Sequence, residues 1–394
     1  MRKLATIQRI TGLRPIEGAD LIEVADVLGW SVVVKKGEFS VGDLCVYFEI
    51  DSFLNAADSR YASFEDRFIN WKDKRGMRLK TIRLRKQISQ GLILSIDTFS
   101  ELSPSVRGSA VTEGEDVTEV LGIEKWEPKE ETQSNAGGQE QRSKSKPFPS
   151  FLRKSDQERV QNCLTELKRR GEESFEVSIK LDGSSMTVYH VNCTSPMFND
   201  ILEEQEARML RGMGFFKKAL FKAKNFLGFY KKPTVVEGVC SRNIELDVND
   251  DNHFSKFVRD TNMLEAMDNL SSNIAVQGEL IAPSIQNNYE KVNDFQFYVY
   301  DVYDIDRQEY ASPNVARYYA DLLGFNYVPV LKYTAKLSDF GDIDNPRELA
   351  DAILAFAEGP GMNKEVKREG VVFKSNNTQF SFKAISNSYL LKKG

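Results

Sequence analysis

The chain has 394 residues, of which 41% are apolar and 28% charged, as expected for a globular protein of two or more domains. A formal net charge of -5 excludes binding of nucleic acid through overall positive charge, so such a role depends on local patches. The four cysteines form no C-x-x-C pair, which argues against a zinc site. The N-terminal residues lack the apolar core of a signal peptide, and no apolar stretch of about 18 residues is present. We therefore expect an intracellular protein, cytoplasmic or nuclear, without membrane association.

Residues 1–125 are predicted to form an OB-fold domain. Short segments rich in valine, isoleucine and aromatic residues, such as "DLCVYFEI" (43–50), alternate with glycines, as in a small β-barrel. The stretch 72–86 contains eight basic residues and one acidic residue. It is either a solvated edge of the barrel or a phosphate-binding surface, with Lys80, Arg83 and Arg85 as the candidate phosphate-binding residues.

A linker is predicted over residues 126–150. Its central part, "KEETQSNAGGQEQRSKSK" (129–146), contains no apolar residue larger than alanine. Such a segment buries too little surface to offset its ordering entropy. The second domain is accordingly assigned to residues 151–394.

The second domain has an α+β pattern. A helix is expected to begin at Ser155, with a capping box to Glu158, and to end at Gly171. Strands are expected over 175–180, 186–191, 274–281, 295–305, 369–374 and 379–385, and helices over 255–269 and 346–357.

The segment "FEVSIK" (175–180) ends in a lysine on the polar face of a predicted strand. Phe175, Val177 and Ile179 alternate onto the apolar face, so Lys180 should point into solvent or a cleft. Asp182 and Gly183 predict a tight turn, after which "SMTVYHV" can return as the paired strand. A lone K-x-D-G is most often an exposed hairpin, so this motif by itself assigns no function.

Six ordered motifs remove that ambiguity. "KLDGSS" (180–185) resembles motif I of the covalent nucleotidyltransferases, the ATP-dependent ligases and capping enzymes. The others resemble motifs Ia, III, IIIa, IV and V: "VCSRNIEL" (239–246), "QGELIAPSIQNN" (277–288), "FYVYDVYDI" (297–305), "REGVVFKSN" (368–376) and "FSFKAISNSYLLK" (380–392). With the N-terminal segments, the chain resembles the RNA ligase branch typified by the Deinococcus and Naegleria enzymes. The implied fold is α+β: an N-terminal OB-type β-barrel followed by a nucleotidyltransferase (ATP-grasp-like ligase) domain built on antiparallel sheets.

The resemblance implies an ATP-dependent RNA ligase. It would seal 3′-OH/5′-phosphate nicks through lysyl-AMP and RNA-adenylate intermediates, in RNA repair, using ATP and Mg²⁺ or Mn²⁺. The implied substrate is nicked duplex RNA or an RNA-containing duplex, and we expect a monomer.

The resemblance also implies site residues. The catalytic residues would be Lys180, Asp182 and Lys383, and the metal-binding residues Glu369 and Glu279. ATP would be bound by Lys180, Arg159, Ser185, Arg242, Glu279 and Lys383, with Tyr300 or Phe297 stacking on adenine. Motif V usually reads K-x-K, whereas Ser381 or Ile385 replaces its second lysine here. His190 and His253 fit no metal or acid–base constellation and are interpreted as structural.

Two alternatives stay open. Other K-x-D-G enzymes such as DNA ligases carry an OB domain after motif V, whereas only eleven residues follow Lys383 of motif V here. An RNA-binding protein with a decayed nucleotidyltransferase domain is the second alternative.

A basic aromatic segment at about 196–234 is predicted as an insertion between motifs I and Ia. Its part 208–232 has eight basic residues and no acidic residue. It is either a helix docked on the domain, a membrane-surface helix, or an RNA clamp, which we favour.

Overall fold

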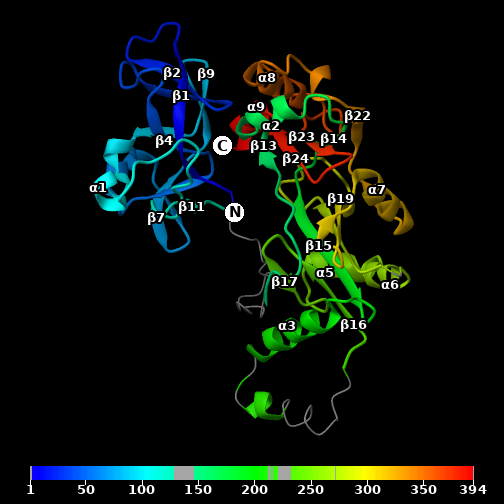
Figure 1. Cartoon of the computed structure of the whole chain (residues 1–394). Coiled ribbons are helices and arrows are strands. Elements are labelled where there is room, and N and C mark those ends of the chain that lie inside the picture. The colour runs from blue at the N-terminus through cyan, green and yellow to red at the C-terminus, as the bar shows by residue number, and fades with distance from the viewer. Residues whose placement is uncertain are drawn as a thin grey trace.

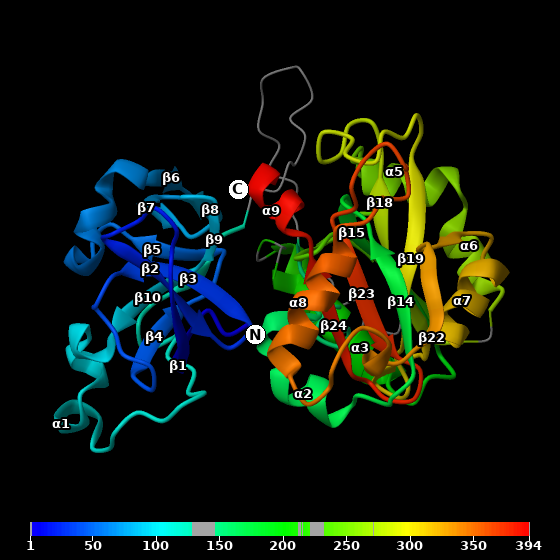
Figure 2. The same cartoon turned by 90° about the horizontal axis from the view of Figure 1, so that it is seen from above.

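A computed structural model of the chain describes residues 2–127, 146–211, 214, 216–220, 232–270 and 272–393. The N-terminal strands lie apart from the later strands, with the end of the chain between them (Figures 1 and 2). Among the described residues, no helix is long and apolar enough to cross a membrane.

The N-terminal part is built from short antiparallel strands. One sheet has the order β10-β4-β1-β2-β3, a second has the order β11-β5-β7-β6, and β8 and β9 form a hairpin. Leu4, Ile7, Val46 and Phe48 pack in one buried cluster, and Ile10, Trp30, Tyr47 and Ile93 in another. The strands are β1 (Ala5–Pro15), β2 (Ile22–Val27), β3 (Trp30–Lys35), β4 (Leu44–Phe48), β5 (Ser52–Asn55), β6 (Ile69–Trp71), β7 (Lys74–Arg78), β8 (Thr81–Leu84), β9 (Gln87–Gln90), β10 (Leu92–Ser95) and β11 (Glu124–Lys125).

The C-terminal part has two mainly antiparallel sheets. The first runs β12-β17-β16-β15-β18-β19-β20, with β21 beside β19, and the second runs β13-β24-β23-β14-β22. The first comprises β12 (Lys146–Pro147), β15 (Ser184–Asn192), β16 (Val235–Cys240), β17 (Ile244–Leu246), β18 (Ile274–Ile281), β19 (Gln296–Asp304), β20 (Glu309–Tyr310) and β21 (Asn326–Tyr327). The second comprises β13 (Glu158–Arg159), β14 (Phe175–Lys180), β22 (Val330–Ala335), β23 (Gly370–Ser375) and β24 (Ser381–Ile385).

The predicted strands are confirmed, with ends that agree within two residues. The predicted hairpin after Lys180 is wrong. β14 pairs with β22 and β23, whereas β15 pairs with β16 and β18. The turn at residues 181–183 therefore carries the chain from one sheet to the other.

All but the last of the following helices pack on the faces of the two sheets, and the last, α9, lies between the two domains (Figure 2). They are α2 (Leu164–Arg169), α3 (Phe198–Arg211), α5 (His253–Asp260), α6 (Met263–Asp268), α7 (Pro313–Leu322), α8 (Pro346–Ala357) and α9 (Asn387–Lys393). The prediction for 346–357 is confirmed, but 255–269 forms two helices because Asn262 has a left-handed backbone (φ +50°).

The predicted helix start at Ser155 is wrong. The hydroxyl of Ser155 donates to Asp301 instead of capping a helix, and Glu158 and Arg159 extend alongside β24 as β13. Helix α2 begins only at Leu164. The expected apolar face does exist, since Val160 and Leu167 are buried in one cluster.

The beginning of the predicted insertion packs on the first of the two C-terminal sheets. Phe198, Ile201 and Leu202 of α3 lie in a buried cluster with Tyr189 of β15. Arg208 pairs with the buried Glu245 at 3.1 Å. Most of the segment 208–232 lies outside the described residues, so the predicted RNA clamp stays a prediction.

Candidate active site

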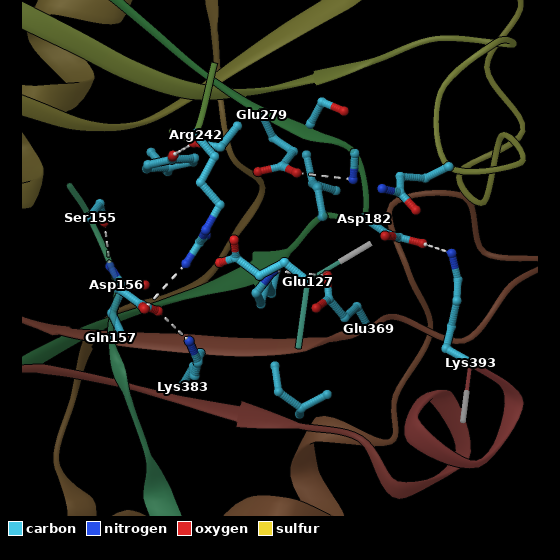
Figure 3. A pocket seen from close by; sticks show the side chains of 18 of the residues that line it. Glu127, Ser155, Asp156, Gln157, Asp182, Arg242, Glu279, Glu369, Lys383 and Lys393 are labelled. Carbon is cyan, nitrogen blue, oxygen red and sulfur yellow. Dashed lines mark hydrogen bonds and ion pairs between the residues drawn. The ribbon is translucent and has the colours of Figure 1, made fainter. Parts of the chain in front are cut away.

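A cavity of about 700 Å³ lies between the two C-terminal sheets and the N-terminal domain. Most residues predicted from the sequence line it, although they come from distant strands (Figure 3). They are Arg159, Lys180, Asp182, Ser185, Arg242, Glu279, Tyr300, Glu369, Lys383 and, from the N-terminal domain, Lys80.

Lys180 stands at the end of β14 beside Glu369. Its register partner on β23 is Gly370, and its ammonium donates to Glu369 Oε2 at 3.0 Å. Burial acts to lower the pKa of Lys180, but the carboxylates of Glu369 and Glu279 more than offset it, and the pKa is raised. Lys180 is therefore an ammonium ion, held by a carboxylate that can accept its proton.

Gly183 is required by the close approach of β18. A Cβ at this position would lie 2.6 Å from the carbonyl oxygen of Leu280 and 2.6 Å from the Ile281 side chain. The amide of Gly183 donates to Glu279 Oε1 at 3.0 Å. Burial raises the pKa of Glu279 to about 7, although Lys180 acts in the opposite direction. The absence of a side chain at Gly183 thus allows the turn to lie close enough to β18 for its amide to bind Glu279.

Lys383 and Arg242 share one carboxylate, that of Asp156. Lys383 Nζ lies 2.8 Å from Oδ1 and Arg242 Nη2 lies 3.2 Å from Oδ2 (Figure 3). Burial lowers the pKa of Lys383 to about 8, with Asp156 opposing this shift. Burial acts to raise the pKa of Asp156, but Lys383 and Arg242 hold it below its usual range. Two cations therefore point to one anionic position in the cavity.

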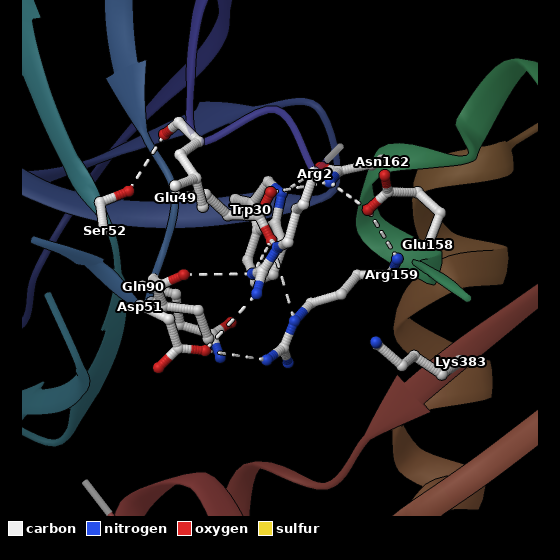
Figure 4. Close-up of polar contacts among 12 residues, drawn as sticks. Arg2, Trp30, Glu49, Asp51, Ser52, Gln90, Glu158, Arg159, Asn162 and Lys383 are labelled. Carbon is white, nitrogen blue, oxygen red and sulfur yellow. Dashed lines mark hydrogen bonds and ion pairs between the residues drawn. The ribbon is translucent and has the colours of Figure 1, made fainter. Parts of the chain in front are cut away.

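Arg159 adds a third cation next to Lys383. The two residues are register partners in the parallel pair β13–β24. The guanidinium of Arg159 lies 3.8 Å from Glu49 and 3.7 Å from Asp51 of the N-terminal domain (Figure 4). Among the described residues, its Nε and Nη1 atoms have no hydrogen-bond partner, although the side chain is only 8% exposed. Such unsatisfied buried donors favour an anionic ligand.

Tyr300 faces the cavity and Phe297 does not. A bulge at Gln277/Gly278 shifts the pairing of β18 and β19, and the Tyr300 hydroxyl lies 2.8 Å from Ser185 Oγ. Phe297 is 2% exposed and packs with Phe257 and Phe325 in the core. The prediction that Phe297 could stack on adenine is therefore wrong, because its ring lies on the core face of the sheet.

Part of the basic stretch 72–86 is neutralised by acidic neighbours. Lys74 pairs with Glu124, and Arg78 with Asp51. Lys80 reaches the cavity, whereas Arg83 and Arg85 are exposed on the β8–β9 hairpin and do not line it.

Sequence reasoning missed several residues of the cavity. They are Arg2, Trp126, Asp156, Tyr389 and Lys393, and His253, interpreted as structural, also lines it. Apart from Tyr389, which lies within motif V, they fall outside the six motifs. Only the three-dimensional fold brings the others to the site.

The carboxylates fit a metal ion that is bound together with a nucleotide. Glu279 and Glu369 come from different sheets and both interact electrostatically with Lys180. Within the described part of the chain, no group of three or more His, Cys, Asp or Glu side chains could hold a metal ion. Mg²⁺ commonly takes one or two carboxylates and completes its shell with phosphate oxygens and water.

Comparisons with known proteins agree with this architecture. A family model for an OB-fold domain matches residues 4–96, and the RNA ligase family model matches residues 173–385. No curated protein matches the chain.

Solved structures of the RNA ligase of Naegleria gruberi are similar over the whole chain. A mutant in the apo form is 39% identical, with a TM-score of 0.76, and the match covers 99% of this chain and 98% of that chain. A mutant with ATP and Mn is 38% identical, covers 99% of both chains and has a TM-score of 0.75. The enzyme with PPi is 38% identical, with a TM-score of 0.75 and coverage of 100% and 99%.

An OB-fold domain joined to a nucleotidyltransferase domain defines the class of protein. The chain belongs to the RNA ligase family. The predicted fold class is confirmed, as is the prediction that the protein is an enzyme, an RNA ligase.

Proposed function

We propose that the protein is an ATP-dependent ligase that seals 3′-OH/5′-phosphate nicks in duplex RNA or RNA-containing duplexes, in RNA repair. One observation carries the proposal: the Lys180 ammonium, 3.0 Å from Glu369, lies in the same cavity as Lys383, Arg242 and Arg159. The complexes of the Naegleria enzyme with ATP and Mn, and with PPi, support ATP and a divalent metal as the cofactors.

In the first step, Lys180 Nζ attacks the α-phosphorus of ATP. Lys180 must first lose a proton, and Glu369 lies within hydrogen-bond distance to accept it. The N–P bond forms as the bond to the pyrophosphate oxygen breaks, which leaves lysyl-AMP and free pyrophosphate. Negative charge grows on the phosphoryl oxygens, where Lys383, Arg242 and Arg159 stabilise it.

The other site residues bind the nucleotide and the metal. Tyr300 stacks on adenine, and Ser185 orients the tyrosine hydroxyl. Glu279 binds a ribose hydroxyl or the metal ion, and Glu369 contributes to the metal site. A bound Mg²⁺ or Mn²⁺ would neutralise phosphate charge.

In the later steps, the adenylate passes to the RNA 5′-phosphate, and the 3′-OH then displaces AMP. Residues of the N-terminal part, such as Arg2 and Lys80, line the cavity together with residues of the two C-terminal sheets. We assign RNA docking to the cations Lys80, Arg83 and Arg85 of the N-terminal domain.

The first experiment measures intact mass after incubation with ATP and Mg²⁺. The wild-type chain should gain one AMP, and Lys180→Ala should gain none. Lys332→Ala, which changes an exposed lysine of β22, is the matched control and should gain AMP like the wild type. Labelling of Lys180→Ala would exclude Lys180 as the nucleophile, and an unlabelled wild type would support a decayed site.

The second experiment measures sealing of nicked duplexes with varied strand composition. We expect sealing when RNA supplies the nick termini. Sealing of all-DNA nicks at an equal rate would favour the DNA ligase alternative.

A further inference from the structure

Helix α9 lies between the two domains (Figure 2), and its residues Tyr389, Leu390 and Lys393 line the cavity. Its last turn carries Lys393, whose ammonium lies 2.9 Å from Asp182 Oδ2 (Figure 3). The Asp182 and Lys393 side chains are 9% and 29% exposed, so solvent screens this ion pair only weakly. Lys393 therefore contacts the turn at residues 181–183 from a helix that belongs to neither sheet.

One side of α9 is fixed to the catalytic domain. Ser388 donates to Glu358 through its hydroxyl at 2.6 Å and its amide at 2.9 Å. Tyr389 packs edge-on against Tyr289, with ring centroids 5.3 Å apart. These contacts set the rotation of the helix about its axis and thus the direction of Lys393.

The other side of α9 rests on the N-terminal domain. Leu390 packs against the buried cluster that contains Trp30 and Tyr47. Gln90 Nε2 donates to Asn387 Oδ1 at 3.2 Å. Any movement of the N-terminal domain therefore acts on the helix that carries Lys393.

The charges around Lys180 explain why Asp182 needs a cation of its own. Glu369, Glu279 and Asp182 all interact electrostatically with Lys180, whose ammonium donates to Glu369. Glu290, which is 2% exposed, adds a carboxyl group close to Asp182. Lys393 pairs with Asp182 at 2.9 Å, and the Asp182 charge acts on both Lys180 and Glu369, so loss of Lys393 would leave that charge uncompensated beside the nucleophile.

We propose that Lys393 is a positioning residue for lysyl-AMP formation. It compensates the charge of the Asp182 carboxylate beside Lys180, and α9 makes this contact depend on docking of the N-terminal domain. The inference rests on the proposed function and adds a residue outside the six motifs.

The test is single-turnover formation of enzyme–AMP by the full chain at varied ATP concentration. Lys393→Met should lower the maximal rate roughly 10- to 100-fold, as loss of a residue that orients an active-site group typically does. The ATP concentration at half-maximal rate should change by less than about twofold, because the lost interaction does not bind ATP. Lys393→Arg should restore most of the rate. Lys392→Met removes the exposed neighbouring lysine of the same helix and should behave like the wild type.

A second arm repeats Lys393→Met in a Leu390→Ala background. Because Leu390→Ala loosens α9 from the N-terminal domain, the effect of Lys393→Met should shrink there. An undiminished effect would refute the dependence on docking.

The other possible results of the Lys393→Met experiment lead to different conclusions. A wild-type rate in Lys393→Met would refute the positioning role, and a faster rate would show that Lys393 inhibits the site. A lower thermal unfolding midpoint with no rescue by Lys393→Arg would show a structural role only. A wild-type chain that forms no AMP adduct would reject the proposed function instead.

Discussion

Replacing Asp156 by asparagine should tighten the binding of AMP. Asp156 places its two carboxylate oxygens 2.8 Å from Lys383 and 3.2 Å from Arg242, the cations that we assign to the α-phosphate. A phosphate must therefore share these cations with Asp156 or displace it. Asparagine keeps the size of the side chain and removes the competing charge.

The magnitude follows from the exposure of the three groups. A charge-assisted hydrogen bond contributes about 1.5–3 kcal/mol net. The Lys383 side chain is 14% exposed, whereas those of Asp156 and Arg242 are 34% and 44% exposed, so solvent weakens the Arg242 contact. We therefore expect a gain of about 1–2 kcal/mol, roughly a 5- to 30-fold lower Kd for AMP.

Isothermal titration with AMP and with adenosine measures this effect. Adenosine lacks the phosphate, so its affinity should be the same in Asp156→Asn and in the wild type. Asp342→Asn, at an exposed loop position outside the cavity, is the matched control. Weaker AMP binding in Asp156→Asn, or an equal gain for adenosine, would refute the competition.

Two further predictions concern the pH dependence of AMP binding and the turn at Gly183. Burial lowers the Lys383 pKa to about 8, so its charge is present below this pH and is lost above it. The affinity for AMP should therefore fall as the pH rises through about 8. The variant Lys383→Met should bind AMP weakly and should show no such fall. Titrations with AMP from about pH 6.5 to about pH 9.5, in steps of roughly one pH unit, check both expectations. Gly183→Ala should slow lysyl-AMP formation by roughly 100-fold, because its Cβ would lie 2.6 Å from the Leu280 carbonyl oxygen and push β18 and Glu279 away. A normal labelling rate in Gly183→Ala would mean that the turn tolerates a side chain.

The motif residues of the site were found from the sequence because each stands in a short local pattern. Strand alternation correctly turned Lys180 and Lys383 away from the apolar side chains of β14 and β24. Alternation depends on near neighbours along the chain, so it survives without knowledge of the fold.

The same local information failed where a residue had two plausible partners. Ser155 and Glu158 match a capping box, yet Ser155 donates to Asp301, which is 146 residues away. Phe297 and Tyr300 are aromatic residues on opposite faces of β19, and only the packing of Phe297 in the core decides which ring faces the cavity.

The sequence by itself determined where the predicted strands of the C-terminal part lie and which residues form the motifs. The pairing of β14 with β23 rather than β15, the place of Asp156 between two cations, and the contact of Lys393 with Asp182 were decided by the tertiary structure. These contacts join residues separated by 86 to 227 positions, and their free energy depends on burial and distance, which no local pattern encodes.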